Sequence, residues 1–167
     1  TAGESIFISG SGSGLLSRAS SSGNAGQITV STPTLTMGDS GTISVATSGA
    51  GNAGNILLNV SSFAQTGGAQ VVSSTTGDGD GGTVAVTASE LVSISGAGSG
   101  LFSTASSTGN AGQITVSAPA LAPVPTLTMA DGGTISVATS GAGSAGSILL
   151  NANNLSLTGG AQVVSST

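Results

Sequence analysis

An eight-residue segment, Gly23 to Val30, recurs without change from Gly109 to Val116. Variants of its first half, a Gly-x-x-Gly return, begin at residues 23, 51, 79, 109 and 143, so the successive spacings are 28, 28, 30 and 34 residues. Each return precedes a short run of alternating apolar and small polar residues, the pattern of a β-strand. Its glycines predict a turn with positive φ, which glycine adopts without steric cost. A sequence period of this size is typical of solenoids.

Three short strand patterns follow one another within each period. In the second period they are Ile28–Val30, Leu35–Met37 and Ile43–Val45, separated by Gly, Asp, Ser and Pro residues. A β-sandwich also uses short strands, but it does not require matching strands every 28 residues. We therefore predict an all-β fold, a triangular parallel β-helix with about six coils of about 28 residues and three short strands per coil. Six coils at the ~4.8 Å inter-strand spacing give a rod on the order of 30 Å long.

A longer repeat is superimposed on the coils. Residues 1–86 form a first long repeat and residues 87–167 an incomplete second one, interrupted by a six-residue insertion near residues 120–125. We treat the whole of residues 1–167 as one β-helix segment. No polar cap is visible at either end, although an uncapped solenoid exposes a strand edge and an open core. Two explanations stay open: the segment was cut from a longer array, or identical units stack end to end.

Alternation along the strands predicts which side chains face the core. Three aliphatic columns should run through the interior, because side chains two residues apart share a face of a strand. They are Leu15, Ile43, Val71, Leu101, Ile135 and Val163; Ile28, Ile56, Val84, Ile114 and Ile148; and Val30, Leu58, Val86, Val116 and Leu150. The same alternation turns other apolar side chains outward, where a column of them is a candidate surface for self-association. These are Leu16, Val72, Phe102 and Val164 on one face, and Leu57 and Leu149 on another.

The composition excludes several classes of function. Only 4% of the residues are charged, Arg18 is the single basic residue, and Cys and His are absent. Binding to a nucleic-acid backbone needs several Lys or Arg side chains, so no nucleic-acid partner is expected. No apolar run is long enough to span a membrane as a helix. No residue pattern predicts a cofactor.

One turn position carries Asn24, Asn52, Asp80, Asn110 and Ser144 in successive coils. We predict a structural turn ladder, because Asn, Asp and Ser tolerate unusual φ values and hydrogen-bond the backbone and one another. Asp78 and Asp80 have the spacing of a calcium-binding loop. An EF-hand would place Glu at the twelfth position, where residue 89 is Ser. The two aspartates are therefore weak Ca²⁺ candidates, and no metal site is predicted.

The remaining acids recur with the architecture. Glu4 matches Glu90 and Asp39 matches Asp131, so these carboxylates do not converge on one pocket. Polysaccharide lyases and hydrolases built on β-helices need clustered carboxylates and usually a basic residue or a metal. We therefore predict no catalytic residues and no enzyme. Ice or polysaccharide binding is a minor alternative, because the Thr29, Leu57, Ala85, Thr115 and Leu149 series breaks any regular threonine row.

The motif Gly-Asn-Ala-Gly-x-Ile-x-Val, followed by a Leu-x-Leu-x-x-Gly-Ala-x-Val pattern at Leu155–Val163, resembles the repeats of filamentous-haemagglutinin-like exoproteins of two-partner secretion. The resemblance covers nearly the whole chain. It implies a right-handed parallel β-helix at the cell surface of, or outside, a Gram-negative bacterium. It further implies a long fibre that acts in adhesion or in the biofilm matrix.

Two forms of this function are expected from the sequence. The segment is either part of a self-assembling fibre that contacts copies of itself and a host or matrix surface, or the passive stalk of a large adhesin whose binding tip lies elsewhere.

Overall fold

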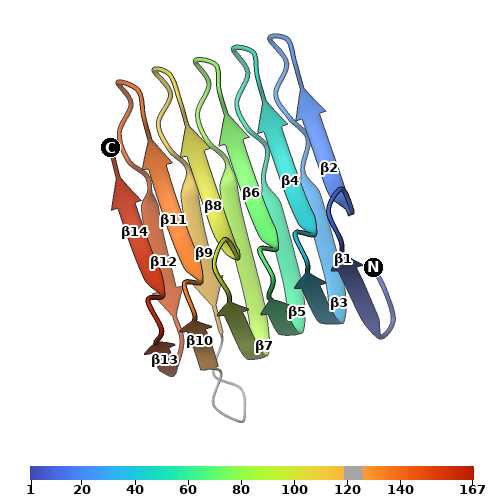
Figure 1. Ribbon diagram of the computed structural model, residues 1–167. Coiled ribbons are helices and arrows are strands. Elements are labelled where there is room, and N and C mark those ends of the chain that lie inside the picture. The colour runs from blue at the N-terminus through green and yellow to red at the C-terminus, as the bar shows by residue number, and fades with distance from the viewer. Residues whose placement is uncertain (119–125) are drawn as a thin grey trace.

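The computed structural model describes residues 1–118 and 126–167, which form a solenoid of parallel strands (Figure 1). The strands are β1 (Ser5–Ser9), β2 (Gly14–Ala19), β3 (Ile28–Gly38), β4 (Thr42–Thr47), β5 (Ile56–Gln65), β6 (Gln70–Thr75), β7 (Thr83–Ser95), β8 (Gly100–Ala105), β9 (Gln113–Ser117), β10 (Thr126–Ala130), β11 (Thr134–Thr139), β12 (Ser147–Asn151), β13 (Asn154–Leu157) and β14 (Gln162–Ser166). The predicted all-β parallel β-helix is confirmed.

The strands form two sheets that wind around a common core. One sheet has the order β1-β3-β5-β7-β10-β13, with β9 pairing with β7 and β12. The other has the order β14-β11-β8-β6-β4-β2 and lies toward the viewer in Figure 1. The chain therefore passes six times through the second sheet, which amounts to about five full turns. The first coil (β1 and β2) and the last coil (β12, β13 and β14) lie at opposite ends of the molecule.

The predicted strand segments are present. In β3, β5 and β7 the first two segments are continuous, whereas in the last coil they are the separate strands β12 and β13. β3 continues from Ile28 to Gly38 through a bend at Pro33, where two successive residues are exposed and the alternation of buried side chains changes phase. A coil therefore has three faces but only two hydrogen-bonded sheets.

Extra residues are accommodated at the corners. Val60 pairs with Ala88, whereas Ser62 pairs with Leu91, so β7 carries one residue more than β5 at the bend. The inward side chains before and after the bend keep their alignment. The insertion predicted near residues 120–125 lies outside the described residues.

The three inward columns are confirmed by strand register and burial. Val71, for example, is fully buried between Ile43 and Leu101 in the neighbouring coils. At the ends of the solenoid, side chains of these columns have a neighbouring coil on one side only, and Leu15, for example, is 39% exposed. Burial of aliphatic area between successive coils therefore stabilises the solenoid, at about 25 cal/mol per Å².

The glycines of the returns have a different role from the one predicted. None of Gly51, Gly54, Gly79 or Gly82 has a positive φ. Instead, a Cβ at Gly54 would overlap the carbonyl oxygen of Gly26 in the preceding coil, and the other three meet a carbonyl in the same way. The returns need glycine because successive coils approach each other too closely for a side chain. The positive φ angles lie in the turns between the two sheets, as at Asp39 (48°), Ser40 (66°) and Asp131 (51°).

Candidate functional site

The predicted turn ladder is present as a continuous row of hydrogen bonds. The Asn52 N–H donates to Asn24 Oδ1 at 2.8 Å, and the Asp80 N–H donates to Asn52 Oδ1 at 2.8 Å. The row continues from Asn110 N–H to Asp80 Oδ1 at 2.8 Å and from Ser144 N–H to Asn110 Oδ1 at 2.9 Å. Each side-chain oxygen thus satisfies a backbone donor of the next coil. The ladder therefore joins successive coils.

Two buried serines add a second set of bonds between returns, and sequence reasoning did not identify them. Ser73 Oγ donates to the Gly54 carbonyl at 3.0 Å and accepts the Gly82 N–H at 3.0 Å. Ser103 repeats this one coil later, donating to Gly82 at 2.9 Å and accepting from Gly112 at 3.1 Å. The sequence feature that could have identified them is a serine at a strand position that faces the core. These serines satisfy backbone groups that the glycine-rich returns would otherwise leave unpaired.

The aspartates proposed as weak Ca²⁺ candidates are used differently in the structure. Asp78 Oδ1 accepts hydrogen bonds from Ser107 Oγ at 2.6 Å and Thr108 Oγ1 at 3.1 Å. The Ser107 hydroxyl, followed by that of Thr108, lowers the pKa of Asp78 below its ordinary value. Asp80 belongs to the turn ladder. Across residues 1–118 and 126–167, no three carboxylates come close enough to hold a metal ion.

Three of the four remaining acids are also held in separate turns and corners. Asp39 accepts from Ser9 Oγ at 2.8 Å, and its repeat equivalent Asp131 accepts from Ser95 Oγ at 3.1 Å. Glu90 accepts from Ser62 Oγ at 3.1 Å. Each of these three carboxylates therefore accepts a hydrogen bond from a serine of a neighbouring coil.

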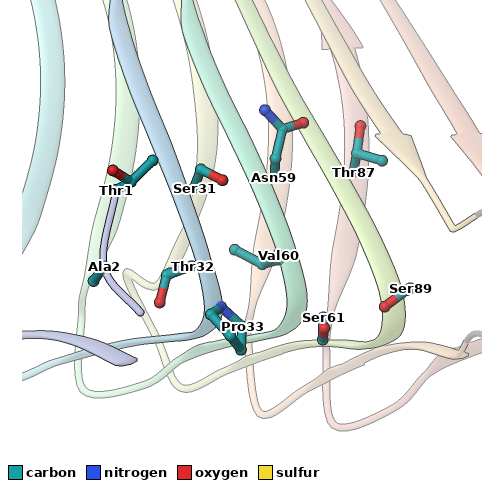
Figure 2. A pocket seen from close by; sticks show the side chains of 10 residues that line it. All are labelled: Thr1, Ala2, Ser31, Thr32, Pro33, Asn59, Val60, Ser61, Thr87 and Ser89. Atoms are coloured by element: carbon teal, nitrogen blue, oxygen red, sulfur yellow. The ribbon is translucent and has the colours of Figure 1, made fainter. Parts of the chain in front are cut away.

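A surface pocket lies where β3, β5 and β7 bend (Figure 2). It is lined by Thr1, Ala2, Ser31, Thr32, Pro33, Asn59, Val60, Ser61, Thr87 and Ser89. These side chains are small, and none is ionisable. A second concavity runs along the turn ladder, where Asp80 is the single charged residue in the lining. Neither hollow brings together an acid and a base.

The outward columns proposed for self-association are confirmed in register. Leu16, Ser44, Val72, Phe102, Ser136 and Val164 are successive partners across the second sheet. Leu57 and Leu149 lie in the Thr29 column of the first sheet. Only Leu16 (49%) and Leu149 (55%) are strongly exposed. The Phe102 ring lies over Gly100, with Cζ 2.9 Å from the position that a Cβ there would occupy, so part of this ring is covered.

Exposed apolar side chains gather at the two ends. Among the described residues the large exposed ones are Phe7, Leu15, Leu16, Leu91, Leu149, Leu155 and Leu157. All except Leu91 belong to the first or the last coil. Ile6, Ile148, Leu150 and Val163 of these coils are also only partly buried. Sequence reasoning left both end-to-end stacking and the long faces open as contact surfaces, and the residues that it named lie on the long faces.

No family model, curated protein or solved structure matches this chain. In the described part of the chain, no helix has the length and apolar character needed to cross a membrane.

Proposed function

We propose that this chain is a structural repeat segment of a secreted bacterial surface fibre, with a role in adhesion or in the biofilm matrix. The observation that carries the proposal is that polar side chains are used to join coils. The turn ladder and the buried serines bond successive coils, and four of the six carboxylates accept hydrogen bonds from serines of neighbouring coils. A stiff, weakly charged rod follows from this arrangement. The extracellular location is supported by the motif resemblance described above.

Immuno-electron microscopy tests the location. Antibodies raised against the 167-residue chain should label fibres or shed material of intact producing cells. Permeabilised cells stained for a cytosolic protein provide the control. Labelling that requires permeabilisation would contradict the proposal.

Two forms of the role remain to be separated, a self-assembling fibre and a passive stalk. Electron microscopy of the purified chain over a dilution series distinguishes the two forms. Filaments that persist on dilution support assembly, whereas short rods of about 30 Å support the stalk.

A further inference from the structure

One polar tripeptide at a corner of the solenoid takes no part in joining coils. It is Asn59-Val60-Ser61, at the bend of β5, and it has the Asn-x-Ser form of an acceptor for asparagine-linked sugars. Within the described chain, neither the Asn59 side-chain amide nor the Ser61 hydroxyl makes a hydrogen bond. The fold therefore does not use the Asn59 amide. By contrast, a side-chain oxygen accepts a backbone N–H of the next coil at each of Asn24, Asn52, Asn55 and Asn110.

We propose that Asn59 is a glycosylation site, at which a transferase of the producing cell attaches a sugar to Nδ2. The co-substrate is a glycosyl phosphate donor. Nδ2 forms a bond to the anomeric carbon, the bond from that carbon to the phosphate oxygen breaks, and the phosphate leaves with the electron pair. Nδ2 loses one proton to a base of the transferase. This inference rests on the proposed extracellular role, because the acceptor pattern is used at the surface of secreted proteins.

Asn59 stands on the outer surface of the first sheet with short side chains on both sides (Figure 2). It is exposed, and its partners in the neighbouring strands are Ser31 and Thr87. The hollow beside it has a volume of about 410 Å³ and is lined by uncharged side chains. A sugar on Nδ2 therefore has room over the neighbouring coils, and it displaces no side chain of the core or of the turn ladder.

The bend leaves Ser61 without a paired residue in either neighbouring strand. Between β3 and β5 the pairing skips Ser61, where Pro33, which has no N–H to donate, lies opposite. Between β5 and β7 the pairing skips Ser61 again, at the register shift between Val60 and Ser62. A transferase can therefore engage the Asn59 amide and the Ser61 hydroxyl without breaking a pair of the sheet. Exposed segments with few backbone bonds are the places where folded chains admit modifying enzymes.

The long repeat supplies a matched asparagine that lacks the acceptor pattern. Asn151 is the repeat equivalent of Asn59, is also exposed, and lies in the same outward column of the first sheet. It is followed by Ala152 and Asn153, so no hydroxyl stands two residues after it. The two asparagines share their place in the coil and differ in the acceptor pattern. Asn59 should therefore be modified and Asn151 should not.

A second Asn-x-Ser tripeptide begins at Asn154. It lies within β13 rather than at a bend, and its Ser156 is paired with Thr128 of β10. The hydroxyl side of this tripeptide thus belongs to a regular strand pair. Asn154 should therefore carry less sugar than Asn59, and the ratio of the two occupancies measures the effect of the bend.

Peptide mass spectrometry of the protein purified from its producing cells tests the proposal. The peptide that contains Asn59 should be heavier than its sequence by the mass of one or more sugar residues, and fragmentation should place them on Asn59. Asn59→Gln and Ser61→Ala should each abolish this added mass, because each removes one half of the acceptor pattern. Ser61→Thr should retain it, because threonine also supplies a hydroxyl at that position.

A gain of modification provides the converse test. Asn153→Ser gives residues 151–153 the acceptor form, so Asn151 should acquire sugar in this variant. Circular dichroism and the denaturation midpoint are the controls for folding. Neither Asn59→Gln nor Ser61→Ala removes a hydrogen bond of the described chain, so both measurements should match the wild type. A loss of sugar in these variants is then a loss of the acceptor rather than of the fold.

The outcomes separate this proposal from the broader function. Recovery of the Asn59 peptide in its unmodified form alone would overturn the glycosylation site and leave the surface fibre standing. Sugar that persists in full in Asn59→Gln would place the modification on other residues and overturn the site as well. Equal occupancy at Asn59 and Asn154 would overturn the role of the bend. Absence of surface labelling in the immuno-electron microscopy would instead contradict the proposed function itself.

Discussion

The same substitution made at an open end and in the middle of the solenoid should have very different costs. Leu101 is fully buried, with Val71 on one side and Ile135 on the other. Its repeat equivalent Leu15 has a neighbour, Ile43, on one side and is 39% exposed. Leu101→Ala should lower the free energy of unfolding by about 2–5 kcal/mol, because it removes buried methylenes and leaves a cavity. Leu15→Ala should cost about 1.5 kcal/mol, since roughly 60% of the side chain is buried and the gap opens to solvent.

The assay is equilibrium urea denaturation followed by circular dichroism, at a dilution where the mass is 15.4 kDa. The variants are compared as single chains, so that contacts between copies do not change the exposure of Leu15. The two variants share residue type, column and long-repeat position, so the number of neighbouring coils is the main difference between them. Equal losses of stability would refute the reasoning that contacts between coils carry the stability.

Three further changes test individual features. Gly54→Ala should prevent the close approach to Gly26 and lower the free energy of unfolding by about 3 kcal/mol or more, because the added methyl group overpacks the contact. Gly23→Ala is the control: no atom lies within 4 Å of its Cβ, so the denaturation midpoint should change little. Asn52→Ala should lower the free energy of unfolding by about 1 kcal/mol in the same assay, because the Asp80 N–H loses its hydrogen-bond acceptor. The pKa of Asp78 is lowered, so its contribution to the free energy of unfolding is present above the pKa of an unfolded Asp and is lost as the pH falls through the folded pKa. Asp78→Asn should therefore remove this part of the stability loss in an acid titration of unfolding.

Strand alternation made the core predictable from the sequence. The period of two is a fixed property of an extended backbone, so aligning Ile28 with Ile56 was enough to assign both columns of that strand. The turn ladder was predictable for a similar reason, because a residue type that suits one turn recurs in the next coil. The sequence also predicted that Glu4, Glu90, Asp39 and Asp131 do not converge on one site, since these acids recur as two repeat-equivalent pairs.

Features that depend on the distance between coils could not be predicted in this way. The glycines of the returns looked like positive-φ residues, and their close approach to a carbonyl appears only when two coils are placed together. The covering of Gly100 by Phe102 depends on a side-chain rotamer. The exposure of Leu155 and Leu157 depends on which coil is last, whereas alternation treats every coil alike.

The corners have a consequence for how such a chain can change over evolution. Val60 and Ser62 keep their partners in β7 although the longer bend carries Ser89 and Glu90 in place of Ser61 alone. Insertions at a bend therefore leave the alignment on both sides intact. Mutation can lengthen a corner without disturbing the neighbouring coils, and a peptide epitope could be grafted there for the same reason.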